Sequence, residues 1–182
     1  PTVVQRLAGY AIVQISAGEH HSTALTEGGE LLLLVWGRLD SGQLGIDPAA
    51  LSADDCVRDA RGNLRYLRTP HADPGIRFST IGCGTDHNIA VSMEGQAYSW
   101  GFSGSYQTGL GPDADDEIMT PTGVENTATR GVRMTFAAAG GQFSILAGVP
   151  ADPANCSYSC ADAHVNDADT NDDEEAVEEG GD

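Results

Sequence analysis

Near the start of the chain, apolar and polar positions form a pattern, and this pattern recurs twice later in the sequence. Apolar residues lead from Ile12 to a glycine, Gly18, and after a few polar residues a second apolar run begins. The same order recurs from Phe78 through Gly84, and it begins a third time near Gly140. Short apolar runs without helical spacing, separated by glycine turns, are typical of β-strands. The pattern therefore predicts an all-β protein built from repeats.

Each of the first two copies continues in the same way. A glycine turn leads to a second strand that ends in Trp36-Gly37 or Trp100-Gly101, and a glycine-rich loop follows. The apolar runs lack strict polar alternation, which indicates sheets covered on both faces by neighbouring sheets, as in a propeller. The repeats are expected near residues 12–50, 78–122 and 134–148.

The segment between the first two copies, residues 51–75, departs from the pattern. It carries acidic residues, four arginines and two prolines, and it predicts a long exposed loop. An incomplete propeller would also expose the apolar sides of its terminal blades. Among these, the apolar stretch Leu31–Trp36 is expected to be the most exposed.

The repeated residues resemble the regulator of chromosome condensation repeats. The residues that carry the resemblance are Gly18-Glu19-His20-His21-Ser22-Thr23-Ala24-Leu25, Trp36-Gly37 and Gly42-Gln43-Leu44-Gly45. The resemblance covers about residues 1–150 and implies an incomplete seven-bladed β-propeller of two to three blades, the carboxyl-terminal fragment of a longer protein. The order of the last repeats and the double histidine are most similar to the family's guanine-nucleotide exchange factor for the GTPase Ran. The same repeat also serves ubiquitin ligases and binding propellers, so fold alone does not fix activity.

The double histidine places two rings on opposite sides of a strand. Side chains alternate in direction along a strand, so one of His20 and His21 should pack inside the blade while the other faces a loop surface. His21 aligns with His87 and Phe143, a large ring in each repeat, and structural packing is expected for these rings and for Trp36 and Trp100. His20 aligns with polar residues, Asp86 and Gln142, which predicts a polar rim at one end of the propeller.

The resemblance assigns functional roles to this rim. His20 falls on the histidine that the Ran exchange factor uses to accelerate nucleotide release, and it is the candidate catalytic residue. Glu19, Asp86 and Gln142 are candidate partner-binding residues, while Phe143 stands where the animal factor has a second functional histidine. The implied mechanism is noncovalent, because the factor binds the nucleotide-free GTPase more tightly than the loaded form. The implied partner is a Ran-type small GTPase in the nucleus, with the cytoplasm as an alternative location, and histones or the nucleosome bind through the full-length protein.

Charge changes the interpretation of the chain's end. The net charge is −18, and the segment 151–182 holds 11 of the 27 acidic residues. This low-complexity acidic segment is expected to be a disordered tail that serves solubility or faces histones. The chain has no lysine, so direct nucleic-acid binding by this segment is not expected. No apolar run is long enough to cross a membrane.

The sequence offers little bond-making chemistry. Cys156, Cys160 and His164 are spaced four apart, but a fourth ligand is missing and the spacing is not a usual zinc pattern, so neither a metal nor a cofactor is expected. Phosphate-binding glycine motifs and a nucleophile elbow are absent. Three hypotheses follow: an exchange factor, a propeller-type binding scaffold or inhibitor-like module, and, least supported, a hydrolase or metal enzyme.

Overall fold

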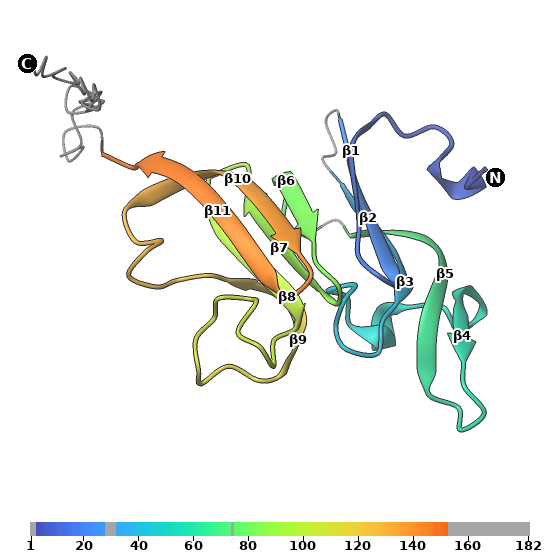
Figure 1. Cartoon of the computed structure of the whole chain (residues 1–182). Coiled ribbons are helices and arrows are strands. Elements are labelled where there is room, and N and C mark those ends of the chain that lie inside the picture. Colours follow the sequence, from blue (N-terminus) through green and yellow to red (C-terminus); the bar gives the residue numbers. More distant parts are fainter. Residues whose placement is uncertain (1–2, 28–31, 74, 153–182) are drawn as a thin grey trace, which may run out of the picture.

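The computed structural model describes residues 3–27, 32–73 and 75–152, and these form three antiparallel sheets that we call blades 1 to 3 (Figure 1). Blade 1 has the strand order β1-β2-β3-β5-β4, blade 2 the order β6-β7-β8-β9, and blade 3 contains β10 and β11. The strands are β1 (Ile12–Ala17), β2 (His21–Thr26), β3 (Leu33–Arg38), β4 (Cys56–Arg58), β5 (Leu64–Asp73), β6 (Phe78–Cys83), β7 (His87–Ser92), β8 (Ala97–Phe102), β9 (Glu117–Gly123), β10 (Val132–Gly140) and β11 (Phe143–Pro150). Short 3-10 turns span Gln5–Leu7, Pro48–Ala50 and Ala53–Asp55. The all-β prediction is confirmed.

Blades 1 and 2 share one strand register, which confirms that they are copies of one unit. His21 pairs with Gly37 in blade 1, and His87 pairs with Gly101 in blade 2. Every residue of β7 is buried. This continuous burial arises because neighbouring blades cover both faces of the sheet, and it explains why the strand sequence shows no polar alternation.

The glycine that follows each tryptophan is required by a close approach of two strands. Gly37 has a φ of +107° and Gly101 a φ of +99°, a region that side chains disfavour. A Cβ atom on Gly37 would lie 2.5 Å from the backbone oxygen of His20, and one on Gly101 would clash with Asp86 in the same way. The Trp-Gly pair therefore positions the residue just before β2 or β7.

The contact between blades 1 and 2 is built around Trp100. Its ring is fully buried, lies 5.7 Å from the Phe78 ring between centroids, and donates from Nε1 to the Gln43 carbonyl at 3.2 Å. Gly45 lies against the same ring. The tryptophan of blade 2 thus packs against the glycine-rich loop of blade 1.

Two of the expected structural rings are less buried than the sequence predicted. Trp36 is half-buried, and Phe143 is 56% exposed although its ring covers Gly140. Each lies in a terminal blade. Burial of such a ring depends on a blade packed beside it, so repeat position alone does not determine exposure.

Residues 51–75 do not form the long loop that the sequence predicted. They contain one 3-10 turn, Ala53–Asp55, and two strands, and β5 pairs with β3 as the fourth strand of blade 1. A register shift between Val35 and Gly37 accommodates the buried Pro70, because a proline that cannot donate to the ladder is tolerated at a bulge. β4 then adds a short outer strand.

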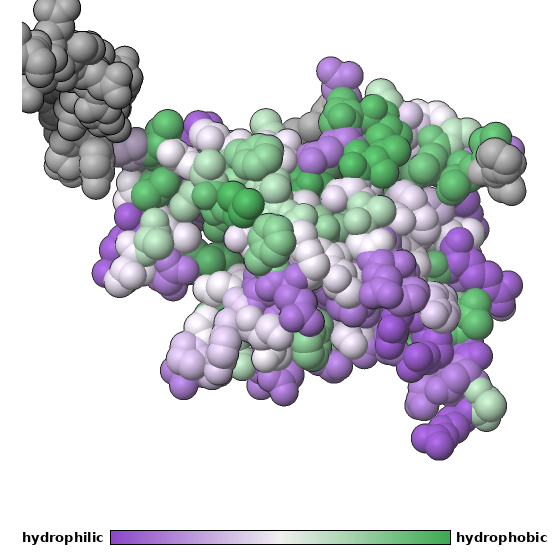
Figure 2. All heavy atoms as spheres, viewed as in Figure 1, coloured by the Kyte–Doolittle hydropathy of each residue, from purple (hydrophilic) through white to green (hydrophobic). Residues whose placement is uncertain are grey.

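The apolar surface lies elsewhere than expected. Leu33, Leu34 and Val35 are buried, so the expectation of an exposed Leu31–Trp36 stretch was wrong for these residues, and Leu31 lies outside the described residues. Exposed apolar side chains gather on the two terminal blades instead (Figure 2). They include Val13 and Ile15 on β1, and Phe136, Phe143, Ile145 and Val149 on β10 and β11.

No helix among the described residues is long and apolar enough to cross a membrane. The predicted acidic tail lies almost wholly outside the described residues, as do Cys156, Cys160 and His164. The boundary near residue 150 and the tail remain predictions.

The exposed apolar side chains predict self-association of residues 1–182. Two open blade faces with large apolar groups should bind hydrophobic dye and associate at micromolar concentration. The substitutions V13S/I15S and F136S/I145S should reduce dye binding, as measured by fluorescence, and shift sedimentation toward the monomer. A monodisperse wild-type monomer with one sharp thermal transition would contradict the expectation.

Candidate partner-binding rim

One end of the three blades is formed by equivalent turns, which we call the rim and define as residues 18–20, 84–86 and 140–142. The turns are tied together through the backbone. The Glu19 amide donates to the Thr85 carbonyl at 3.1 Å, and the Thr85 amide donates to the Gly141 carbonyl at 3.0 Å. These bonds continue from blade to blade, so the rim is one rigid surface.

Buried rings lie directly beneath the rim and reach into the next blade. His21 is 2% exposed, and its Nε2 lies 2.9 Å from Oδ1 of Asn88 in blade 2. His87 is fully buried, and its Nε2 lies 3.0 Å from Oγ of Ser144 in blade 3. The two bonds are equivalent, because Asn88 and Ser144 each follow the ring position of their own repeat.

The polar partner of each ring makes a second bond back to the preceding blade. Asn88 donates from Nδ2 to the Gln43 carbonyl at 2.7 Å, and Ser144 donates from Oγ to the Gln107 carbonyl at 2.8 Å. With Nδ2 used as a donor, Oδ1 of Asn88 accepts, so Nε2 of His21 carries a proton. The ring, the next blade and the glycine-rich loop are thereby joined.

Burial keeps both rings neutral. It lowers the pKa of His21 below the ordinary value of 6.5, and the hydrogen bond to Asn88 offsets part of this effect. Burial likewise lowers the pKa of His87. Within the part of the chain that the structure describes, Nδ1 of each ring is buried without a hydrogen-bond partner, which suits the unprotonated nitrogen of a neutral imidazole.

His20 lies at the surface of the rim. Its side chain is exposed, and its carbonyl accepts from the Arg38 amide at 2.8 Å. His21 is buried and His20 is exposed, as the sequence predicted, although His20 lies in the turn before β2 and not within the strand. Glu19 lines a shallow hollow of about 350 Å³ between the three turns, whereas His20 does not.

The other two candidate residues have different surroundings. Asp86 is half-buried and accepts from Nε2 of Gln43 at 3.1 Å, so its carboxylate is held in place by the loop of blade 1. Gln142 is exposed beside a hollow between blades 2 and 3. The structure thus places Glu19, His20, Asp86 and Gln142 at one end of the three blades, and among the described residues their side chains form no direct hydrogen bond or ion pair with one another.

A charged network stands beside His20 on blade 1. Asp40 pairs with Arg38 at 2.5 Å and with Arg65 at 2.6 Å. Partial burial by itself raises the pKa of Asp40, but the hydrogen bond and charge of Arg38, with the charge of Arg65, lower it below its ordinary value. The hydrogen bond from Arg38 to Asp40 raises the pKa of Arg38, and the charge of Asp86 contributes in the same direction. The network therefore connects to the rim.

Two segments of the chain match a known family, one in blade 1 and the other running from the second half of blade 2 into blade 3. Residues 12–43 and 94–147 match the description "Regulator of chromosome condensation (RCC1) repeat". The chain belongs to the RCC1 repeat family. The blades described above are therefore part of an RCC1-type propeller.

Relatives of this RCC1-repeat chain include proteins from two yeasts, one of which is named as an exchange factor. It is 46% identical over 151 residues to protein pim1 of Schizosaccharomyces pombe, covering 82% of this chain and 27% of that protein. It is 39% identical over 139 residues to the guanine nucleotide exchange factor SRM1 of Saccharomyces cerevisiae, covering 76% of this chain and 28% of that protein. The chain thus spans about a quarter to a third of the length of such relatives.

A solved structure supports the same arrangement of blades. Prp20p of Saccharomyces cerevisiae is similar with a TM-score of 0.74 and 36% identity, over 81% of this chain and 33% of that one. That structure was described together with the binding properties of Prp20p to Gsp1p and histones.

Sequence reasoning missed the residues that hold the rim in place. Gln43 was quoted only as part of the family motif, and Asn88 and Ser144 were given no role, although Gln43 recurs as Gln107 and a polar residue follows the ring position in each repeat. Comparing small polar positions between repeats would have found them. The Arg38, Asp40 and Arg65 network has no such signal, because the equivalent positions of blade 2 carry different residues, Phe102, Gly104 and Asp116.

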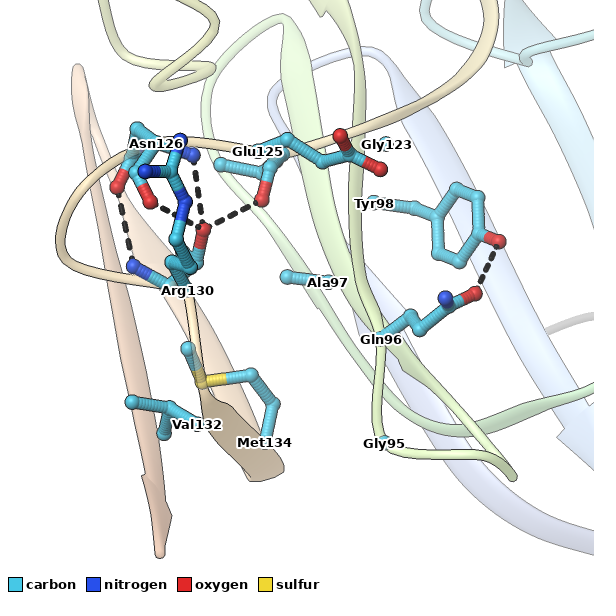
Figure 3. Close-up of a pocket in the computed structure, with 12 residues that line it drawn as sticks. Gly95, Gln96, Ala97, Tyr98, Gly123, Glu125, Asn126, Arg130, Val132 and Met134 are labelled. Carbon is cyan, nitrogen blue, oxygen red and sulfur yellow. Dashed lines mark hydrogen bonds between the residues drawn. The ribbon is translucent and has the colours of Figure 1, made fainter. Parts of the chain in front are cut away.

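The hollow shown in Figure 3 lies at the opposite end of the blades. It has a volume of about 270 Å³ and is lined by the turn before β8, the segment after β9 and the start of β10. Arg130 and Asn126 stand over an apolar floor that includes Val132 and Met134. No candidate rim residue reaches it. Within the described residues, no group of three or more His, Cys, Asp or Glu side chains is placed to hold a metal.

The buried histidines predict that folding stability falls in mild acid. Their pKa values are lower in the folded state than in the unfolded state, so below about pH 6.5 the unfolded chain binds protons that the native state does not. Stability from these groups is present above that pH and is lost as the pH falls. His87→Phe, which takes the residue type found at position 143, should flatten the pH dependence.

This expectation is tested by denaturant unfolding between about pH 7.5 and 5. Carboxylate titration provides a common background for both proteins. If the free energy of unfolding changes equally with pH in wild type and His87→Phe, the buried imidazole does not carry the pH dependence.

Proposed function

We propose that this chain supplies part of the GTPase-facing surface of a Ran-type guanine-nucleotide exchange factor. The observation that carries the proposal is the position of His20, exposed on a rigid rim and held through its backbone by Arg38. The family resemblance gives this histidine its role in nucleotide release. Membership of the RCC1 repeat family and the named exchange factor SRM1 support the assignment.

The proposed action is noncovalent. An exchange factor accelerates nucleotide loss when it binds the nucleotide-free GTPase more tightly than the loaded form. The rim offers an imidazole, two carboxylates and an amide at His20, Glu19, Asp86 and Gln142, groups suited to polar contacts with a protein surface. A rigid rim favours such differential binding, because it does not adapt equally well to both GTPase states.

The proposed location is the nucleus, where a Ran-type exchange factor acts on chromatin. Prp20p binds Gsp1p and histones, and we extend these two kinds of partner to the full-length protein that shares this propeller. The rim of this chain is proposed for the GTPase, whereas histone contacts are not assigned to any of its described residues.

His20→Ala should slow nucleotide release. The assay uses a whole propeller, a chimera in which residues 1–150 replace the matched repeats of SRM1. Release of a fluorescent guanine nucleotide from a Ran-type GTPase, followed by stopped flow, should slow by roughly tenfold or more, equal to about 1.4 kcal/mol in the barrier. The melting temperature of this variant should stay nearly unchanged, because His20 is exposed.

His21→Ala is the matched control. It removes a buried ring and leaves Asn88 without its partner, so it should lower the free energy of unfolding by about 2 kcal/mol or more. Normal exchange by a well-folded His20→Ala chimera would overturn the role of His20 in nucleotide release. Absence of exchange by the unsubstituted chimera would overturn the proposed function itself.

A further inference from the structure

The arginines of this acidic chain are concentrated in one hairpin. The hairpin, residues 56–68, consists of β4, the turn that follows it and the first half of β5. It carries four arginines and one aspartate, a net charge of +3 in a chain of net charge −18. Figure 2 shows the hydrophilic surface over this hairpin. Four of the nine basic residues therefore lie on thirteen consecutive positions.

The hairpin projects at the rim end of blade 1. Arg38, at the end of β3 that holds the His20 carbonyl, pairs across the sheet with Tyr66. From Tyr66 the chain continues back through Leu64 to the turn, beyond the last residue of β3 (Figure 1). The opposite end of β5, at Asp73, pairs with Leu33 and lies away from the rim. A partner that covers His20 would therefore have the hairpin at its side.

The hairpin is held rigidly against the rim. Asp40 bridges Arg38 and Arg65, and the Leu39 amide donates to the Arg65 carbonyl at 3.1 Å. At the tip, Oδ1 of Asp59 accepts from the amides of Arg61 and Asn63 at 2.8 and 2.9 Å. The position of the hairpin is thus fixed before any partner binds, which lowers the ordering cost of an interface.

Two of its guanidinium groups are left for a partner. Arg61 and Arg68 are exposed, and among the described residues no hydrogen bond or ion pair engages either side chain's guanidinium. Arg65 is engaged by Asp40, and Arg58 donates to the Gly62 carbonyl at 2.7 Å. Unengaged arginines on a rigid support are suited to carboxylates, which they bind in a two-point geometry.

We propose that the hairpin 56–68 is a second docking surface for the GTPase that covers the rim, and that Arg61 and Arg68 bind an acidic patch on it. This inference rests on the proposed function, because it takes the same protein as the partner of both surfaces. The hairpin orients the GTPase by charge and speeds its encounter with His20, while the exchange step belongs to the rim.

The neighbouring charges favour a protein over nucleic acid. The loop before β9 at the same end of blade 2 carries exposed Asp113, Asp115 and Asp116, and Glu117 begins β9. Glu19 and Asp86 add acidic groups on the rim. A continuous phosphate backbone across this end would meet these carboxylates, whereas a protein can present acidic groups to the hairpin alone.

The double substitution R61E/R68E in the SRM1 chimera tests the proposal. The association rate with nucleotide-free Ran-type GTPase, measured by interferometry at about 0.15 M salt, should fall by roughly fivefold or more. At about 0.5 M salt the difference should shrink, because salt screens exposed charges. R61Q/R68Q should give an intermediate loss. Exchange at saturating exchange factor should stay close to that of the unsubstituted chimera.

R130E/R133E is the matched control, since it makes the same change in net charge at the opposite end of the blades. Its association rate should change by less than about twofold. Equal losses in both double variants would show an effect of net charge alone and overturn the proposal. An unchanged association rate for R61E/R68E would also overturn the proposal. A third contrary result would be that R61E/R68E weakens binding of a DNA duplex but not of the GTPase.

Charge-reversal variants of the GTPase test direct pairing with the hairpin. Some acidic-to-lysine variants should restore association with R61E/R68E, and failure of all of them would overturn the pairing.

Two variants of the chimera separate the hairpin proposal from the proposed role of His20. If His20→Ala exchanges nucleotide normally while R61E/R68E slows association, the hairpin proposal stands and the role of His20 fails. If His20→Ala slows exchange while R61E/R68E associates at the normal rate, the role of His20 stands and the hairpin proposal fails.

Discussion

The structure depends on one hydrogen-bonded arrangement that recurs at each contact between blades. A buried imidazole reaches a small polar side chain of the next blade, and that side chain returns to the carbonyl of the preceding glycine-rich loop. Buried polar groups are costly unless they are paired. Because each pair is completed only by the neighbouring blade, the arrangement makes blade order and spacing a condition of stability and resists sliding of one blade past another.

This internal constraint also determines what the rim displays. Burying the His21 ring fixes the first residue of β2, and the preceding residue, His20, lies exposed in the turn that enters the strand. The backbone at His20 cannot shift inward, because Gly37 and the Arg38 amide already contact it. The same arrangement at Gly101 holds Asp86. The candidate functional residues His20 and Asp86 thus directly precede the buried rings, and the packing of the core determines their positions.

The sequence was informative where a feature repeats and uninformative where it depends on a neighbour. The repeated pattern predicted the all-β fold, and repeat alignment predicted a buried His21 beside an exposed His20. It did not predict the exposure of Phe143, because burial of that ring requires a blade beside it. It also mistook β4 and β5 for a loop, since charges and prolines obscured a strand whose bulge accommodates Pro70. The Asp40 network depends on that unpredicted strand, so pattern reasoning could not reach it.

The proposed functions of the rim and the hairpin differ in physical kind. Binding that is equally strong for every state of a GTPase speeds its capture but does not favour nucleotide loss, because only differential affinity shifts that equilibrium. Exposed charges on the hairpin act over distances near the Debye length and contribute mainly to encounter and orientation. The rim acts at contact distance, on a backbone tied from Glu19 to Thr85 and from Thr85 to Gly141. A rigid surface of that kind discriminates between two shapes of a partner, so the discriminating role belongs to the rim and the capturing role to the hairpin.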